Sequence, residues 1–349
     1  MSASRAAMNV APAARTLMPV EQALARLLDG VGPVAARDIA LADAAGLVLA
    51  EPLRVAGPVP PAALALRAGF ALAAADTFGA SHYSPVMLPR LPEPVAAGET
   101  LPAGADSVVE PEAVTILRGR AEIAEPVAPG AWTRRAGEDA AAGAILCEAG
   151  ARLRPHHAAA AGLAGLATAA VRQPRIGLLG SDLSLDLAAS LAKERGAALA
   201  SPGENPDLLV GIDGPGALPE GAEIVAAALA LRPGELARLA RLGPLPIVLI
   251  PPQPDAALAI ALAIILPALD HLAGAKPTSP PIAAPLARKL TSTIGFTEIA
   301  LLARSADGWT PLAIGDLPLS AVARAEAWLA IPPGHEGYPA GHPIAAILL

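Results

Sequence analysis

The chain has 349 residues, 54% hydrophobic and 16% charged, which is longer than one hydrophobic core usually serves. Several domains are therefore expected, and a small disulfide-stapled scaffold is excluded. The 25 Lys and Arg residues against 32 Asp and Glu give a net charge of −7 without a dense basic run, which argues against a nucleic-acid partner. Cys147 is the only cysteine and cannot form an internal disulfide, so a cytoplasmic location is expected.

The N-terminal quarter of the chain predicts a tail, a helix and a boundary. Residues 1–17 lack the continuous apolar run of a secretory signal and predict a disordered tail. Val20–Leu28 places its apolar residues on one helical face. Arg37–Gly46 predicts a strand and a short helix that ends at glycine, followed by the extended segment Leu47–Val55. Gly57–Pro61 marks a domain boundary.

The next stretch is broken by glycine and proline. Between residues 62 and 138 the short apolar runs predict a β-rich domain. Ile145–Leu153 predicts a hairpin and His156–Leu166 a helix that begins after Pro155. Adjacent histidines on that helix point about 100° apart, so we expect no shared metal ion. Three tryptophans are expected to be packing anchors rather than a base-stacking platform: Trp132, Trp309 and Trp328.

Buried strands then alternate with helices. Arg175–Gly180 predicts a strand that leads into the helix Ser184–Arg195. Further strands are predicted at Ala197–Ala200, Pro206–Gly211 and Leu245–Ile250. This alternation favours a mostly parallel sheet that binds ligands at the carboxyl ends of its strands.

One segment, Ile247–Leu269, has the length of a membrane span, for which about 20 apolar residues suffice. Its prolines and Asp255 instead predict a strand, a turn and a buried helix, so no membrane partner is expected. Pro277–Pro281 is typical of a linker. Four strands are predicted after it: Glu298–Ala303, Trp309–Ile314, Ala327–Ile331 and Pro343–Leu349.

Several strings together resemble one known family. Val59–Thr77 is similar to V-P-P-F-D-N-S-A-M-D-G-Y-A-V-R-A-A-D-T, and Ala97–Val109 to T-G-A-P-L-P-x-G-A-D-A-V-V, both of the molybdopterin molybdenumtransferase (MoeA) family. Pro129–Asp139 is a third match. Arg172–Gly180 and Pro246–Leu272 resemble a strand and a strand–turn–helix of the same family, whose eukaryotic relative is the gephyrin E domain. The resemblance covers roughly residues 18–349.

The resemblance implies a multidomain α/β fold with a β-rich insertion domain, a molybdopterin-binding-like three-layer α/β domain and a C-terminal β-barrel. The implied segments are a tail (1–17), a split N-terminal domain (18–57 and 139–173), the insertion (58–138), the α/β domain (174–276) and the barrel (277–349).

The resemblance also implies a cytoplasmic homodimer that inserts molybdate into adenylated molybdopterin and releases AMP, assisted by Mg²⁺ or zinc. Glycine-rich turns before helices offer N–H groups to phosphates, and carboxylates bind cations. Carried over to this chain, the catalytic residues are Asp139, Asp182 and Asp213, with Asp182 and Asp213 also as metal ligands. The residues expected to bind molybdopterin are Arg134, Arg135, Glu138, Gly211, Gly214, Gly216 and Gln253.

The chain departs from the family pattern where acids are expected, so it is interpreted as a divergent member with degraded active-site motifs. D-N-S-A-M-D-G-Y-A is replaced by Ala62–Ala71, which lacks both acids, the Asn and the Ser. Alanine and leucine can neither bind a metal nor transfer a proton. The family's glycine-rich loop S-G-G-V-S-V-G corresponds to Gly211–Gly216, where Pro215 removes an N–H donor. The family's K-P-G-K-P corresponds to Leu231–Glu235, where Glu235 replaces a lysine.

Two functions therefore stay open. The chain is either a transferase with replacement acids, or a catalytically degenerate paralogue that binds molybdopterin or serves as a partner in molybdoenzyme maturation. For the residues themselves, the simpler interpretations are an Arg134–Asp139 turn whose charges pair with one another, and helix capping by Asp182 and Asp213.

Overall fold

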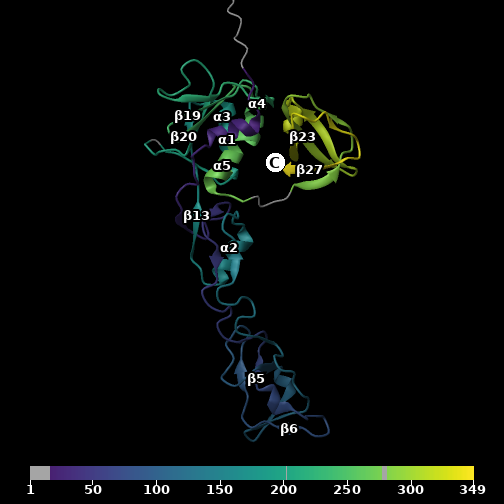
Figure 1. Cartoon of the computed structure of the whole chain (residues 1–349). Coiled ribbons are helices and arrows are strands. Elements are labelled where there is room, and N and C mark those ends of the chain that lie inside the picture. The colour runs from purple at the N-terminus through teal and green to yellow at the C-terminus, as the bar shows by residue number, and fades with distance from the viewer. Residues whose placement is uncertain (1–15, 202, 277–280) are drawn as a thin grey trace, which may run out of the picture.

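The computed structural model describes residues 16–201, 203–276 and 281–349. The predicted N-terminal tail lies almost wholly outside these ranges. The molecule is elongated, with an α/β unit and a C-terminal β unit side by side at one end and a β-rich unit around β5 and β6 at the other (Figure 1). A smaller middle unit that contains β13 and α2 connects the two ends (Figure 1).

The α/β unit is built on a six-stranded sheet. Its strand order is β15 (Ala198–Leu199), β14 (Arg175–Leu179), β16 (Leu208–Ile212), β20 (Leu245–Ile250), β19 (Arg238–Leu242) and β17 (Glu223–Ala226). The first four strands are parallel and were all predicted. The last two are antiparallel and come from residues 213–244, where no strand was predicted.

Apolar helices cover this sheet. The helix α1 (Val20–Leu27), the helix α3 (Leu183–Glu194) and a continuous helical run contribute to one hydrophobic core. The run comprises α4 (Pro254–Ile260), the π-helical turn η3 (Ala261–Ile265) and α5 (Leu266–Ala273). It is long and apolar enough to cross a membrane, but its apolar stretch is 72% buried inside the protein. The prediction of a strand, a turn and a buried helix here is confirmed.

The middle unit combines two parts of the chain. The strand β13 (Thr168–Arg172) lies between β1 (Arg37–Ala40) and β2 (Val48–Leu49), beside β3 (Leu53–Arg54), β12 (Ile145–Cys147) and α2 (Pro155–Leu163). Two predictions are wrong here. Residues 41–46 form turns instead of a helix, because Asp43 and Ala44 donate their N–H groups to carbonyl oxygen atoms three residues back, whereas Gly46 donates to Leu153. The predicted hairpin is absent because β12 pairs with β3 and residues 150–153 bond to residues 47–49.

Arg152 joins the middle unit to the α/β unit. Its guanidinium donates to Asp270 of α5 at 2.9 Å and to the carbonyl oxygen atoms of Gly46 and Arg195 at 2.6 and 2.5 Å. Arg195 also donates to Asp270, at 2.9 and 2.5 Å. One carboxylate thus holds two arginines at the junction between the units.

The β-rich unit consists of short strands, as the glycine and proline spacing predicts. Its sheets are β7 (Glu93–Val95)–β5 (Gly69–Leu72)–β8 (Ser107–Val109), β6 (Val86–Met87)–β10 (Arg120–Ile123)–β9 (Val114–Leu117) and β11 (Thr133–Arg134)–β4 (Leu64–Ala65). The single-turn 3-10 helices η1 (Ala74–Thr77) and η2 (Pro111–Ala113) complete it.

The C-terminal unit contains the four predicted tail strands. They are β23 (Thr297–Ser305), β24 (Gly308–Ile314), β25 (Ala327–Ile331) and β27 (Pro343–Leu348), joined by β21 (Ile282–Pro285), β22 (Leu290–Thr291), β26 (Gly337–Tyr338) and the short α6 (Leu319–Val322). The strand β18 (Leu231–Arg232) pairs with β23 and so adds part of the preceding segment to this sheet. Closure into a barrel and the domain limits stay predictions.

Candidate functional site

The carboxyl edge of the parallel sheet holds three of the predicted residues. Asp182 follows β14, Asp213 follows β16 and Gln253 follows β20, and these three strands are direct neighbours. The helices α3 and α4 begin on the same edge. Ser184 at the start of α3 donates its hydroxyl to the carbonyl oxygen of Pro252 at 3.0 Å, which ties the two helix starts together.

Asp182 is the N-cap of α3. Its Oδ1 accepts the backbone N–H of Ser184 at 2.8 Å. A carboxylate in this position satisfies a helix N–H group and interacts favourably with the positive end of the helix dipole. The capping interpretation therefore describes Asp182 in this structure, and the carboxylate occupies the end of α3 to which a phosphate would also be drawn.

Asp213 is paired with an arginine that was not predicted. Arg238 of β19 donates Nε to Asp213 Oδ1 at 2.6 Å, and Nη2 contacts the same oxygen. Both side chains are only 20% exposed. The backbone N–H of Asp213 also donates to Ile250 at 2.7 Å. Asp213 therefore does not cap a helix; its charge is compensated within the protein.

The predicted glycines differ in their surroundings. A methyl group on Gly211 would lie 2.9 Å from Leu179 Cβ, so this glycine allows neighbouring strands to pack closely. Gly214 has open space at its Cβ position, and Gly216 adopts a positive φ of 73°. Gln253 is exposed at the N-cap position of α4 and makes no side-chain capping bond. The Gly214–Gly216 turn and Gln253 are accordingly the accessible parts of this edge.

The second predicted cluster is an exposed turn. Arg134 Nη1 lies 3.1 Å from Asp139 Oδ1, and these side chains are 45% and 44% exposed. The backbone N–H of Arg135 donates to Glu138 Oε2 at 2.7 Å. Within this turn Arg134 and Asp139 therefore pair with each other, and an exposed pair of this kind contributes little to stability.

The two clusters are far apart in one chain. Arg134 lies in β11, which pairs with β4 in the β-rich unit, whereas the sheet edge belongs to the unit that contains β20 and α4. These units occupy opposite ends of the molecule (Figure 1). A single chain therefore does not bring the Arg134–Asp139 turn to Asp182 and Asp213.

The residues at the sheet edge do not fit a metal ion. Asp182 accepts a helix N–H and Asp213 accepts an arginine. Within the residues that the structure describes, no group of three His, Cys, Asp or Glu side chains could hold a metal. A site with this donor set would lack the several oxygen ligands that Mg²⁺ requires.

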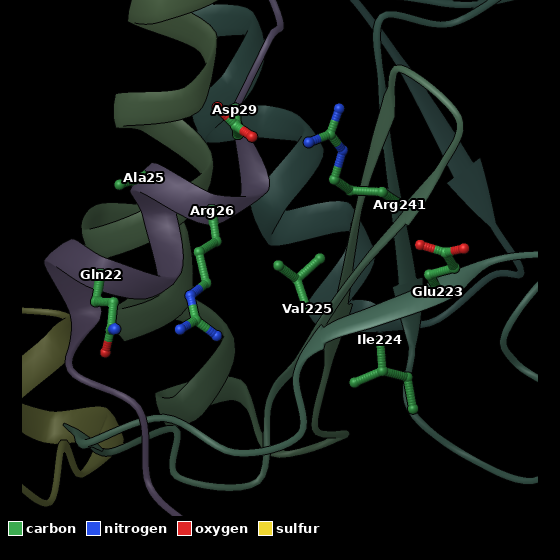
Figure 2. Close-up of a pocket in the computed structure, with 8 residues that line it drawn as sticks. All are labelled: Gln22, Ala25, Arg26, Asp29, Glu223, Ile224, Val225 and Arg241. Atoms are coloured by element: carbon green, nitrogen blue, oxygen red, sulfur yellow. The ribbon is translucent and has the colours of Figure 1, made fainter.

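A separate groove lies between α1 and the antiparallel end of the sheet. Its volume is about 470 Å³, and none of the predicted site residues lines it. Figure 2 shows α1 and the turn after it as one wall, with Arg26 in the helix and Asp29 in the turn, and β17 and β19 as the other wall, with Glu223 and Arg241. Each wall carries one positive and one negative charge, so the groove has no electrostatic preference for a polyanion.

Trp132 is not a packing anchor, contrary to the prediction. It is 46% exposed, whereas Trp309 is 1% exposed and is buried as expected. The Arg67 guanidinium lies 3.4 Å from the centre of a Trp132 ring and forms an ion pair with Glu110 at 3.0 Å. No periodic pattern in the sequence identifies this stack, because its members come from three separate segments.

The single cysteine faces a histidine in the middle unit. Cys147 Sγ lies 3.5 Å from His157 Nδ1, and the cysteine is buried. Burial raises the pKa of the Cys147 thiol, and burial together with His156 lowers the pKa of His157. Both shifts favour the neutral forms, so this pair is not an activated thiolate.

Comparison with known proteins places the chain. Residues 18–165 match the MoeA N-terminal region (domain I and II). The molybdopterin biosynthesis moeA protein of Pyrococcus horikoshii OT3 has the same fold, with a TM-score of 0.77 and 22% identity over 96% of this chain and 100% of that protein. The chain therefore has the fold of MoeA proteins, and its residues 18–165 are similar to the MoeA N-terminal region.

Two further similar proteins have lower fold similarity or match a shorter stretch. A molybdenum cofactor biosynthesis protein from Pyrococcus furiosus aligns with a TM-score of 0.61 and 18% identity over 96% of this chain and 100% of its own. Molybdopterin molybdenumtransferase 2 of Mycobacterium tuberculosis is 29% identical over 170 residues, 44% of this chain. The match spans 41% of the length of that curated relative.

Proposed function

We propose that the chain is a MoeA-type protein of molybdenum cofactor biosynthesis that binds molybdopterin or its adenylated form and inserts molybdate. The observation that carries this proposal is the MoeA fold over nearly the whole chain. Within that fold, the start of α4 and the Gly214–Gly216 turn lie at the carboxyl edge of a parallel sheet, beside the start of α3 that Asp182 caps. Backbone N–H groups in such a place bind phosphates.

A homodimer in the cytoplasm is part of the proposal. Arg134 lies in β11 of the β-rich unit and the sheet edge belongs to the α/β unit, and these units lie at opposite ends of the molecule (Figure 1). If one ligand touches both clusters, the turn must come from a second copy. The division into a split N-terminal domain, an insertion, an α/β domain and a C-terminal barrel, with the limits predicted above, belongs to the same proposal.

The catalytic assignment rests on three carboxylates. In the transferase, Asp139, Asp182 and Asp213 would replace the missing acids, with Arg134 and Arg135 binding anions. Each carboxylate would first have to leave its present partner: Arg134, the start of α3 and Arg238, respectively. Substrate binding would have to supply this rearrangement, because general acid–base catalysis needs a carboxyl group within hydrogen-bonding distance of the reacting atoms.

The second candidate is a catalytically degenerate paralogue that binds molybdopterin or serves as a partner in molybdoenzyme maturation. The segment that aligns with the family's acids favours it. Ala65 is buried in a small apolar cluster with Val95, Leu101 and Val108, and Ala63 packs against that cluster. The two positions that align with the family's acids are Ala63, which packs against this cluster, and Ala68, which is exposed, and neither side chain can transfer a proton.

Complementation together with ligand titration tests both candidates. The full chain is expressed in a strain that lacks its own molybdenumtransferase, and the purified protein is titrated with adenylated molybdopterin. Growth that depends on a molybdoenzyme, with AMP release, supports the transferase. Binding without AMP release supports the degenerate paralogue and refutes the transferase. Failure to bind molybdopterin in either form refutes molybdopterin binding and with it the main proposal.

A variant set localises the activity if the transferase is found. Asp139→Asn, Asp182→Asn and Asp213→Asn should each lower the rate of AMP release by about 10²-fold or more if the residue transfers a proton. Asp316→Asn changes an exposed carboxylate on the loop before α6 and serves as the matched control. Equal rates in all four variants would remove these acids from the mechanism.

A further inference from the structure

Trp132 is held in an unusual position on the Pro129–Asp139 turn. Its backbone has a φ of 53°, a left-handed conformation that few residues other than glycine adopt and that is unfavourable for a bulky side chain. Its carbonyl oxygen accepts the N–H of Leu66 at 2.8 Å, which fixes the turn to the end of β4. The indole is nevertheless 46% exposed. If Trp132 served only to pack a core, burial of its side chain would be expected to offset the cost of this backbone conformation.

Arg67 covers the indole on one side. Its guanidinium lies 3.4 Å from the ring centre, and Glu110 forms an ion pair with the guanidinium at 3.0 Å. An arginine in this position is attracted by the electron-rich face of the ring. Because Arg67 accounts for one face, the exposed area of Trp132 leaves the other side of the ring open to a ligand.

A cation without a partner lies on the same turn. Arg135 has its backbone N–H fixed by Glu138, and a methyl group on Gly130 would lie 3.3 Å from Arg135 Nη2. The Arg135 guanidinium therefore lies close to Gly130, which precedes Trp132 by two residues. Among the described residues it forms no ion pair, in contrast to Arg134, which is paired with Asp139.

We propose that the open face of Trp132 binds the planar heterocycle of a phosphorylated purine or pterin, and that Arg135 binds the phosphate. This rests on the proposed function and names which part of the substrate the turn receives. Stacking on an aromatic face requires only a flat π-system, and a guanidinium binds phosphate oxygen atoms in a bidentate manner. Arg67 and Glu110 act as positioning residues that hold the ring in place.

Calorimetric titration of the full chain with AMP, ribose 5-phosphate and molybdopterin tests this assignment. Trp132→Gly removes the ring, and glycine adopts a positive φ without strain, so the turn should keep its shape. The variant should bind AMP or molybdopterin roughly 5- to 150-fold more weakly, the range expected for one stacked base. Its affinity for ribose 5-phosphate, which has no heterocycle, should not change.

Further variants distinguish the contribution of the Trp132 ring, here called the platform, from that of the phosphate site at Arg135. Arg135→Gln should weaken all ligands that bind, including ribose 5-phosphate. Arg67→Gln should weaken only those with a heterocycle, by about 2- to 5-fold, as for a cation–π contact at an exposed site. Arg26→Gln, an exposed arginine of α1 in the groove of Figure 2, is the matched control and should change none.

Each outcome decides the assignment. Ring-dependent binding of AMP alone assigns the platform to adenine, and ring-dependent binding of molybdopterin alone assigns it to the pterin. The assignment is overturned if the wild-type chain binds neither, if Trp132→Gly binds both normally, or if the loss for ribose 5-phosphate equals the loss for AMP. Ring-dependent binding in a protein that fails to complement would refute only the transferase.

Discussion

Replacing Asp270 by alanine should loosen the junction between the middle unit and the α/β unit. Asp270 accepts hydrogen bonds from Arg152 and Arg195, whose side chains are 19% and 45% exposed. Burial lowers the pKa of Arg152, and the negative charge of Asp270 opposes that shift. Without Asp270, the half-buried guanidinium of Arg152 loses the carboxylate that compensates its charge.

The expected cost lies between two limits. Removal of one partner costs about 3–5 kcal/mol in a buried ion pair and about 0.2–1 kcal/mol in an exposed one. The Asp270 side chain is 25% exposed, and Arg152 retains the carbonyl oxygen atoms of Gly46 and Arg195 as acceptors. We therefore expect a loss of about 2 kcal/mol at this junction.

Hydrogen exchange measures this loss locally, because a chain with several units need not unfold in one step. In Asp270→Ala, amides of α5 and of residues 150–154 should exchange about 30-fold faster, which corresponds to about 2 kcal/mol. Asp316→Ala, on an exposed loop, should change nothing at the junction. If the two variants exchange alike, Asp270 does not hold the units together and the reasoning is wrong.

Three further predictions concern other parts of the chain. The lowered pKa of His157 means that the unfolded state binds its proton more readily, so stability should fall as pH drops below the ordinary value of 6.5, and His157→Gln should reduce this fall in urea titrations. The raised pKa and burial of the Cys147 thiol should make alkylation by iodoacetamide slow until urea unfolds the middle unit, and rapid labelling of the native chain would contradict this. Gly69→Ala should destabilise the β-rich unit by several kcal/mol in thermal unfolding, because its methyl group would lie 2.1 Å from the carbonyl oxygen of Val109; Gly57→Ala, where nothing lies within 4 Å and φ is not positive, controls for the change of residue type.

Helices and strands with long, regularly spaced apolar residues were predicted well from the sequence. The helix α1, the pair β14–α3 and the strand β20 with the helical run after it all follow from hydrophobic spacing bounded by glycine or proline. The strands β17, β18 and β19 were missed. They lie in residues 213–244, where short apolar runs alternate with glycine and proline and resemble a loop.

The sequence predicted where the candidate site residues lie in the fold, but not which side chains they contact. Strand ends correctly placed Asp182 and Asp213 on one sheet edge. The partner of Asp213 could not be predicted, because Arg238 lies 25 residues away on a missed strand. Likewise, composition says nothing about whether a tryptophan is buried, and Trp132 stacks on an arginine 65 positions earlier in the chain.

The buried helical run α4–η3–α5 emerges late from the ribosome, and its main partners emerge before it. Contacts with α1, α3 and β20 all come from residues that precede Pro254. During synthesis this apolar helical run can therefore pack against α1, α3 and β20 as soon as it leaves the ribosome. A circular permutant that begins at residue 245 would release the same 20 residues before α1 and α3 are made, and should aggregate or be captured by chaperones during translation.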